Sequence, residues 1–263
     1  MIPDDIFQKI QRYSQRLKLD LTACEAAKFV QENSISEDGV DTIARLLDFL
    51  CCRKDSTTLN FLLKTSRMPQ KNPRTFDNFD FGRLKGPAIK TLQDLRDLRF
   101  LYSHQNLIFI GPTGIGKTHL ALAYGYQCCR QHKKVYFLTF SELNQKMNEA
   151  RLRGRVGSFV NGLTKPACLI IDEVGHCVMD EANTDLFFQI VQRCSLKDTG
   201  SMIMTSNYQP SEWHKFFAEK ESLLCSLDRI TDNAVISVMQ GRSYRGKKRQ
   251  ILTCEVAPEK TAA

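Results

Sequence analysis

The octapeptide Gly111-Pro112-Thr113-Gly114-Ile115-Gly116-Lys117-Thr118 matches the pattern G-x-x-x-x-G-K-[ST], which is typical of a phosphate-binding loop. A short apolar run at 106–110 precedes it and reads as a buried strand, and residues 119–124 after it open a helix. The glycines let backbone N–H groups curl around a phosphate, and the positive end of the following helix attracts the anion. The sequence therefore predicts a P-loop that binds a nucleotide.

Two side chains of this loop carry chemistry beyond phosphate contact. Lys117 is expected to reach the β- and γ-phosphates of ATP, and the Thr118 hydroxyl is expected to complete the ligand shell of a Mg2+ ion. The residues predicted to bind ATP are Gly111, Pro112, Thr113, Gly114, Ile115, Gly116, Lys117, Thr118 and His119.

A pair of acids ends a second apolar run. Residues 168–171 are Cys-Leu-Ile-Ile, and Asp172 and Glu173 follow directly. Hydrolysis of a phosphoanhydride needs a held metal ion and an oriented water more than covalent help from the protein. Asp172 is therefore predicted to hold Mg2+ together with Thr118, mostly through water, and Glu173 to polarise the attacking water. The predicted activity is hydrolysis of ATP to ADP and phosphate.

Beyond the loop the chain alternates apolar runs with helical patterns. The runs at 135–139, 168–173, 201–207 and 234–239 read as strands, and 106–110 makes a fifth. Such alternation is typical of a parallel sheet that is covered by helices on both faces. The predicted fold class is an α/β P-loop NTPase with a five-stranded parallel sheet flanked by helices.

The first part of the chain differs from the rest. Apolar residues recur at helical spacing up to about residue 65, and a polar, basic stretch with two prolines follows. We predict a small all-helical N-terminal domain over 1–68 and an ATPase domain over 69–263. Within the ATPase domain, 69–75 is expected to be a linker and 250–263 a flexible tail.

Aromatic side chains crowd the segment ahead of the first strand, Thr75-Phe76-Asp77-Asn78-Phe79-Asp80-Phe81. They fit the hydrophobic core of the ATPase domain. They also fit the pocket for the base of the nucleotide, because the segment enters the domain just ahead of the P-loop. Both interpretations stay open at this point.

The composition is that of a soluble globular protein, with 42% of the 263 residues hydrophobic and 25% charged. No apolar run is long enough to span a membrane, and the acidic N-terminus is unlike a signal sequence. The ten cysteines contain no C-x-x-C pair and mostly lie in apolar patterns, which indicates buried thiols in a reducing compartment. We expect a cytoplasmic protein without a membrane partner.

The net charge of +8 and the isoelectric point near 9.0 favour a polyanionic partner, and nucleic acid fits best. No aromatic side chains are interleaved with the basic clusters, so contacts with phosphates without sequence preference are expected. A solvated charged face is the alternative for each cluster. The residues predicted to contact DNA are Lys9, Arg12, Arg16, Arg151, Arg153, Arg155, Lys247 and Lys248.

Together these motifs resemble the IstB/DnaC-like branch of the AAA+ ATPases, which includes ATP-dependent helper proteins of bacterial insertion sequences and bacterial helicase loaders. The similarity extends from about Leu17 to Arg245 and is closest to the IstB-type helpers. Its most specific segments are Leu227-Asp228-Arg229 and Gly241-Arg242-Ser243-Tyr244-Arg245. The other segments that carry it are 79–81, 111–121, 170–175, 205–207 and 211–213.

The resemblance implies roles for residues that the motifs leave open. Asn207 corresponds to the family's sensor residue, Arg229 to the arginine finger that reaches a neighbouring subunit's ATP, and Arg245 to the second sensor arginine. Arg242 stands where helpers often carry an acidic residue, and no full C-terminal lid domain is expected after Arg245. The predicted catalytic residues are Lys117, Asp172, Glu173, Asn207, Arg229 and Arg245.

The resemblance also implies a function. It predicts an ATP-dependent helper of DNA transposition that oligomerises on double-stranded DNA and recruits or activates a cognate transposase at the target site. ATP sites would lie at the interfaces between its subunits, and hydrolysis would drive disassembly. The alternative is a DnaC-like loader of a replicative helicase, since the ATPase cores of the two groups are alike. A small-molecule kinase is disfavoured because it has no need of Glu173 or Arg229.

Overall fold

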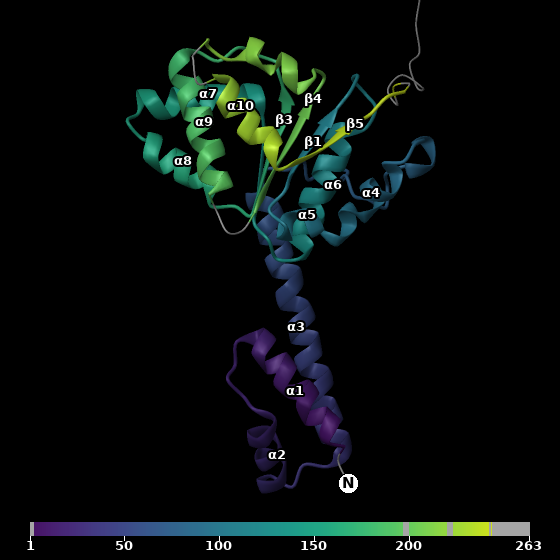
Figure 1. Ribbon diagram of the computed structural model, residues 1–263. Helices are drawn as coiled ribbons and strands as arrows, with labels where there is room; N and C mark the ends of the chain where they lie inside the picture. The colour runs from purple at the N-terminus through teal and green to yellow at the C-terminus, as the bar shows by residue number, and fades with distance from the viewer. Residues whose placement is uncertain (1–2, 197–199, 220–222, 242, 244–263) are drawn as a thin grey trace, which may run out of the picture.

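The computed structural model describes residues 3–196, 200–219, 223–241 and 243. Several residues singled out above lie outside the described residues: Arg242, Arg245, Lys247, Lys248 and the predicted tail at 250–263. In the described part, a helical N-terminal unit leads through one long helix into a layered α/β domain (Figure 1).

Three helices form the N-terminal unit: α1 (Asp4–Leu17), α2 (Ala23–Glu32) and α3 (Glu37–Thr65). Thr22 caps the start of α2, because its hydroxyl accepts the N–H of Glu25 while the Glu25 carboxylate accepts the N–H of Thr22. A small core of their own holds the helices together, made of Ile10, Ala26, Val30, Val40 and Ala44. The predicted helical N-terminal region is confirmed.

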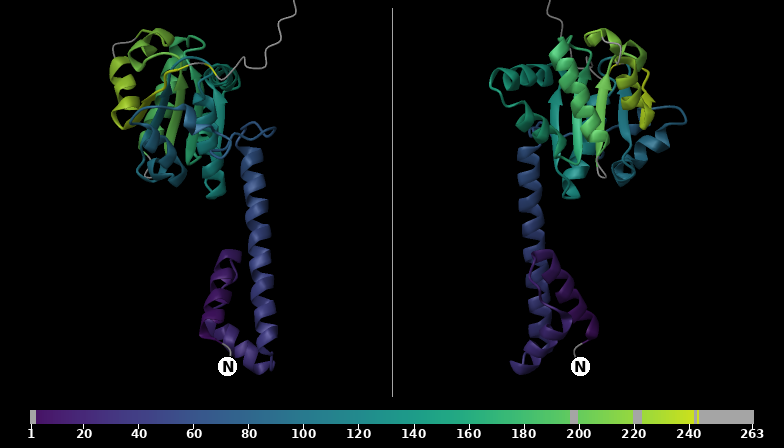
Figure 2. Two further views of the ribbon diagram at one scale, coloured as in Figure 1. Left: turned by 90° about the vertical axis from the view of Figure 1, so that its right-hand side faces the viewer. Right: turned by 60° about the vertical axis from the view of Figure 1, so that its left-hand side comes forward.

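Helix α3 connects this unit to the α/β domain (Figure 2). It has 29 residues, and neither glycine nor proline occurs between Val40 and Thr65, so one uninterrupted helix about 43 Å long forms. At its far end, Leu62 and the following Met68 pack in the same core as Leu107 of the sheet. The N-terminal unit is therefore anchored in the core of the α/β domain.

Five parallel strands form the sheet: β1 (Asn106–Ile110), β2 (Val135–Thr139), β3 (Cys168–Val174), β4 (Ser201–Ser206) and β5 (Ala234–Val238). Their order in space is β2-β3-β4-β1-β5, which confirms the predicted five-stranded parallel sheet. The P-loop strand β1 lies next to β4, and β4 lies next to β3, which carries the acidic pair. The carboxyl ends of these strands meet at one edge, where ligands bind in open parallel sheets.

Helices cover both faces of the sheet, and successive residues of β1 point to opposite faces. Leu107 and Phe109 pack with α6 (Lys117–Arg130) in one core, whereas Ile108 and Ile110 contribute to the other. The second core is covered by α7 (Phe140–Leu152), α8 (Val156–Thr164), α9 (Glu181–Ser195) and α10 (Leu223–Asp232).

Short helices fill the connections: η1 (Phe81–Arg83), α4 (Ile89–Gln93), η2 (Asp94–Asp97), α5 (Arg99–Tyr102) and η3 (Pro210–Phe216). Leu98 separates η2 from α5 with a left-handed backbone, and its side chain is buried in the core on the α6 side. Among them, η2 packs against α6 and α5 against β1, whereas η3 packs against α10.

Candidate nucleotide-binding site

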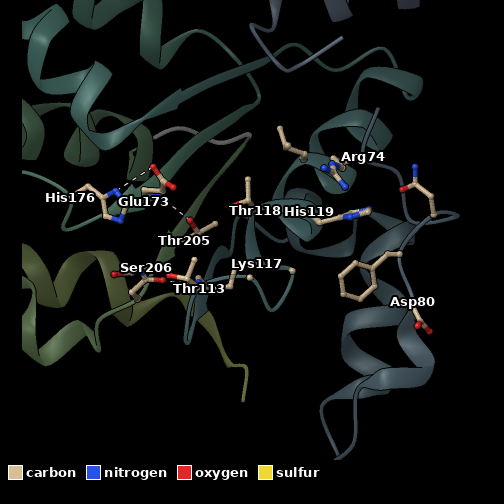
Figure 3. A pocket seen from close by; sticks show the side chains of 16 residues that line it. Arg74, Asp80, Thr113, Lys117, Thr118, His119, Glu173, His176, Thr205 and Ser206 are labelled. Carbon is tan, nitrogen blue, oxygen red and sulfur yellow. Dashed lines mark hydrogen bonds and ion pairs between the residues drawn. The ribbon is translucent and has the colours of Figure 1, made fainter. Parts of the chain in front are cut away.

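A cavity of about 570 Å³ opens at the carboxyl edge of the sheet, beside the P-loop (Figure 3). This volume lies within the range of small-molecule sites, about 300–1,000 Å³. Four parts of the chain line it: the segment before η1, the P-loop with the start of α6, the end of β3 with the turn that follows, and the end of β4. Among the predicted ATP-binding residues, the cavity is lined by Thr113, Gly114, Gly116, Lys117, Thr118 and His119.

Two glycines of the P-loop are required by their surroundings. Gly111 has a φ of 144°, and a Cβ at this position would lie 2.0 Å from the carbonyl oxygen of Met239. Gly116 has a φ of 105°, and a Cβ there would lie 2.7 Å from the ring of Phe79. Both residues therefore need the conformational freedom and the small size of glycine.

Lys117 begins α6 and is only 7% exposed. Its Nζ donates to the carbonyl oxygens of Gly111 (2.6 Å) and Pro112 (2.8 Å) and to Oδ1 of Asn207 (2.9 Å). Asn207 directly follows β4, so the neighbouring strands β1 and β4 bring the predicted sensor next to the predicted phosphate lysine. Charged phosphate oxygens would bind this ammonium more strongly than the neutral oxygens that now accept from it.

Asp172 lies on β3 and is 4% exposed. Its Oδ1 accepts hydrogen bonds from two hydroxyl groups, those of Thr118 at 2.9 Å and of Thr205. Burial raises the pKa of Asp172 above its ordinary value, while the two hydroxyl groups and Lys117 act in the opposite direction. The predicted Mg2+ ligands Thr118 and Asp172 are thus in direct contact.

This pair suits Mg2+ in chemistry and in spacing. Mg2+ prefers oxygen ligands and commonly keeps several waters while a protein supplies one or two oxygens. The Thr118 and Asp172 oxygens are 2.9 Å apart, so the two residues would act on one ion, directly or through bound water. In the described part of the chain, no group of three or more His, Cys, Asp or Glu side chains could hold a metal ion, so a bound nucleotide would have to supply further oxygens.

Glu173 has a left-handed backbone, with a φ of 61°, and β3 shifts register against β4 between Ile171 and Val174. In this bulge the Glu173 N–H donates to the hydroxyl of Thr205 at 3.0 Å instead of to a strand carbonyl. Because the same hydroxyl donates to Asp172, Thr205 holds both acids of the motif.

Sequence reasoning assigned no role to Thr205. The available signal was a hydroxyl residue directly after the apolar run Met202-Ile203-Met204, two residues before Asn207. It also assigned no role to His176, although this residue lines the cavity and its Nδ1 lies 3.3 Å from Oε2 of Glu173 (Figure 3).

The aromatic segment ahead of β1 packs in the core, and one of its rings reaches the cavity. Phe76 and Phe79 are buried in the core, and Phe79 also lines the cavity. The rings of Phe79 and His119 meet edge to face with 5.1 Å between their centres. The Nε2 atom of His119 lies 2.9 Å from the carbonyl oxygen of Thr75, and burial lowers the pKa of His119. These contacts fasten the segment to the first turn of α6.

Arg229 occupies a different place from the other predicted catalytic residues. It is exposed on α10 and is not among the residues that line the cavity. Arg245 lies outside the described residues. The structure thus brings together Lys117, Asp172, Glu173 and Asn207 within one chain, and it leaves Arg229 exposed on α10, outside the lining of the cavity.

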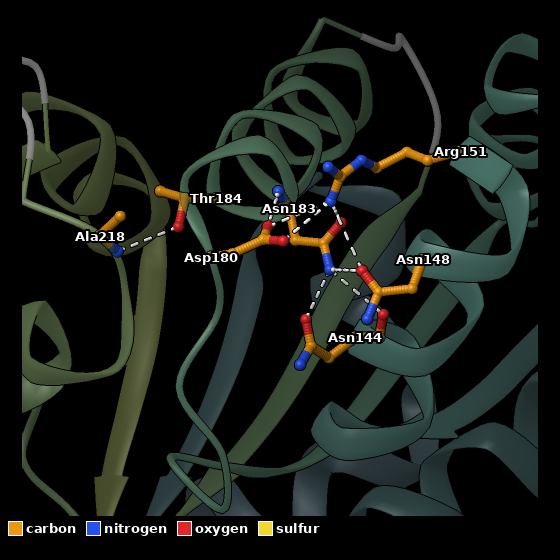
Figure 4. Close-up of polar contacts among 7 residues, drawn as sticks. All are labelled: Asn144, Asn148, Arg151, Asp180, Asn183, Thr184 and Ala218. Atoms are coloured by element: carbon orange, nitrogen blue, oxygen red, sulfur yellow. Dashed lines mark hydrogen bonds and ion pairs between the residues drawn. The ribbon is translucent and has the colours of Figure 1, made fainter.

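Three of the basic residues predicted to contact DNA are engaged within the chain. Lys9 pairs with Asp5 at 3.1 Å, and Arg16 pairs with Asp55 at 2.5 Å. Arg151 contacts the carboxylate of Asp180 and the side chains of Asn183 and Asn148 (Figure 4). By contrast, Arg12, Arg153 and Arg155 are exposed, and no ion pair involves them within the described residues.

A family model described as "IstB-like ATP binding protein" matches residues 13–251. The chain belongs to this family. An IstB-like relative, named as an ATP-binding protein of insertion sequence IS5376 from Geobacillus stearothermophilus, is 29% identical over 93% of this chain and 96% of its own length. Another, named for insertion sequence IS232 of Bacillus thuringiensis subsp. berliner, is 30% identical over 92% of this chain and 95% of its own. ATP binding is the property that the family description and both names share.

The IstB-like chain also resembles solved structures of AAA+ proteins. The crystal structure of the DnaC helicase loader aligns with a TM-score of 0.53 and 16% identity, over 64% of this chain and 97% of that one. Identity at this level shows a shared fold, and the α/β P-loop fold expected from the sequence, with a five-stranded parallel sheet flanked by helices, is confirmed. No helix in the described part of the IstB-like chain is long and apolar enough to cross a membrane.

Proposed function

We propose that the protein hydrolyses ATP in this cavity. The P-loop glycines and Lys117 bind the phosphates, and Asn207 contacts the γ-phosphate or the attacking water. Thr118 and Asp172 would hold a Mg2+ ion, which would supply positive charge to the phosphates when bound, and Glu173 orients the water. The observation that carries the proposal is the hydrogen-bonded series Thr118–Asp172–Thr205–Glu173, which places a metal ligand and a candidate general base at one edge of the sheet.

The role of Glu173 is tested by Glu173→Gln, which keeps the size of the side chain but removes its basic oxygen. We expect kcat to fall by about 100-fold or more, while ATP binding changes by less than about twofold. Glu219→Gln is a matched control, since Glu219 is exposed and does not line the cavity. Normal turnover by the Glu173 variant would overturn the catalytic assignment.

We propose further that Arg229 acts on the ATP of a neighbouring subunit. Its exposed position on α10, away from the cavity of its own chain, supports this role. Arg229→Ala alone is expected to lower kcat by about 1,000-fold or more, as for other arginine fingers. When the Arg229→Ala and Glu173→Gln variants are mixed 1:1, random assembly pairs the intact Glu173 of one variant with the intact Arg229 of the other at about a quarter of the interfaces. ATP hydrolysis should therefore return in the mixture. Absence of recovery in a mixed oligomer would refute action between subunits.

We propose that the oligomer assembles on double-stranded DNA and recruits or activates a transposase. The insertion-sequence names of the relatives, the net charge of +8 and the exposed Arg12, Arg153 and Arg155 support this. Glu173→Gln with ATP should form multimers that stay on duplex DNA during sedimentation. The helicase-loader alternative predicts binding to single-stranded DNA and a helicase, and the relatives' names favour transposition over it.

A further inference from the structure

The carboxylate proposed to orient the attacking water is in contact with a histidine. His176 Nδ1 lies 3.3 Å from Glu173 Oε2, and the two side chains are 41% and 45% exposed. Both residues line the nucleotide cavity, and Figure 3 shows the imidazole and the carboxylate turned toward each other. One of the two oxygens of Glu173 is therefore engaged within the chain.

The backbone of the turn that carries both residues is tightly held. The hydroxyl of Ser206 donates to the carbonyl oxygen of Val174 at 2.7 Å, and the N–H of His176 donates to the carbonyl oxygen of Glu173 at 3.2 Å. Gly175 has a φ of 101°, and a Cβ there would lie 2.8 Å from the rings of Tyr208 and Phe216. Since the main chain is fixed in this way, the position of the Glu173 carboxylate is decided by its side-chain torsions.

We propose that His176 is a positioning residue that holds Glu173 in a resting orientation and so restrains basal ATP hydrolysis. This inference rests on the proposed role of Glu173 in catalysis. An oxygen that is engaged by the imidazole is not available to orient the attacking water, so the contact with His176 competes with hydrolysis. Because both partners are partly exposed, the contact is weak and opens readily when the site is completed.

The weakness of the contact sets the size of the effect. Exposed ion pairs stabilise by up to about 1 kcal/mol, which corresponds to a change of about fivefold in a rate or population. His176→Ala is therefore expected to raise the basal kcat by about two- to fivefold. The KM for ATP should stay the same, because His176 is proposed to act through Glu173 and not on the nucleotide.

Two further variants separate positioning from a general structural effect. His176→Asn places an amide N–H near the position of Nδ1 and should keep the wild-type kcat. His132→Ala removes another histidine–carboxylate pair, with Asp55 at 3.6 Å and exposures of 47% and 38%, at the opposite end of α6, about 20 Å from the P-loop. It should leave kcat unchanged.

The experiment measures steady-state ATP hydrolysis by the full-length protein without DNA, after unfolding curves have confirmed that each variant is folded. A raised kcat in His176→Ala, with wild-type values in His176→Asn and His132→Ala, supports the proposal. An unchanged or lowered kcat in His176→Ala overturns it, as does an equal rise in His176→Asn. The double variant Glu173→Gln/His176→Ala should be inactive; activity there also overturns it. If Glu173→Gln alone hydrolyses ATP normally, the proposed function fails. If Glu173→Gln is inactive and His176→Ala has the wild-type kcat, only the role of His176 is refuted.

Discussion

Replacing Thr205 with valine tests whether one buried hydroxyl organises the acidic motif. The substitution keeps the size and branching of the side chain and removes a group that makes two hydrogen bonds. The Thr205 hydroxyl donates to Asp172 and accepts the N–H of Glu173 at 3.0 Å, and the residue is 1% exposed. A valine methyl group replaces neither bond. The variant therefore leaves a buried carboxylate with one donor fewer and a backbone N–H without its acceptor.

The expected cost follows from these two losses. A hydrogen bond to a charged group contributes about 1.5–3 kcal/mol, and an unsatisfied buried N–H costs about 1 kcal/mol or more. We expect the free energy of unfolding to fall by about 2.5–4 kcal/mol, which lowers Tm by roughly 5–15 °C in a chain of this size. Because Glu173 loses the bond that fixes its backbone, kcat should fall by about 10–100-fold.

Thermal unfolding followed by circular dichroism and a steady-state ATPase assay measure the two effects. Thr205→Ser keeps the hydroxyl and should remain close to wild type in kcat. Thr184→Val is the matched control, since the buried Thr184 hydroxyl accepts the N–H of Ala218 at 3.1 Å and, among the described residues, is hydrogen-bonded to neither acid of the motif (Figure 4). It should cost about 1 kcal/mol and leave kcat unchanged. Wild-type Tm and kcat in Thr205→Val would refute the reasoning.

Three further variants test the metal ligand, the P-loop and the basic turn. Asp172→Asn should abolish hydrolysis yet raise the unfolding free energy of the nucleotide-free protein by about 1 kcal/mol, because burial raises the pKa of Asp172 and disfavours its carboxylate. A raised pKa means that the ionised Asp172 destabilises the fold at pH values above that pKa. This destabilisation disappears as the pH falls toward the ordinary value of 3.8, so the gain in unfolding free energy of Asp172→Asn, measured in urea, should shrink at lower pH. Gly116→Ala should weaken binding of a fluorescent ATP analogue by about tenfold or more through its clash with Phe79, while Gly157→Ala, with open space around it, should not. Arg153→Gln and Arg155→Gln should each reduce the slope of the logarithm of the duplex-DNA binding constant against the logarithm of the salt concentration by about 1. An unchanged slope would show that these residues do not contact DNA.

The features predicted from sequence depend on neighbours along the chain. The P-loop needs particular residues within eight positions, and its glycines are explained by the close approach of Met239 and Phe79. The strands were found because buried parallel strands are continuous apolar runs. The run at 168–173, for example, corresponds to a strand over Cys168–Val174. Local pattern and burial thus coincide in this part of the molecule.

The features missed from sequence depend on contacts between distant segments. Arg151 was grouped with Arg153 and Arg155 because the three are close in sequence. The structure places its Nη1 2.9 Å from Oδ2 of Asp180 and 3.2 Å from Oδ1 of Asn183, residues 29 and 32 positions away. No periodicity or spacing rule connects such positions, so the partner of Arg151 depends on how α7 packs against α9.

The geometry of the acidic pair depends on a residue of the neighbouring strand as well as on the motif itself. Successive side chains of a regular strand point to opposite faces, so Asp172 and Glu173 could not both serve one site in an unbroken strand. The register shift between Ile171 and Val174 and the left-handed backbone of Glu173 remove that conflict, and they deprive the Glu173 N–H of a strand carbonyl. Thr205 supplies the missing acceptor because β4 lies between β3 and β1 in the sheet. The strand order therefore decides the geometry of the acids as much as the motif does, and a chain with the same motif beside an apolar strand would hold Glu173 less firmly.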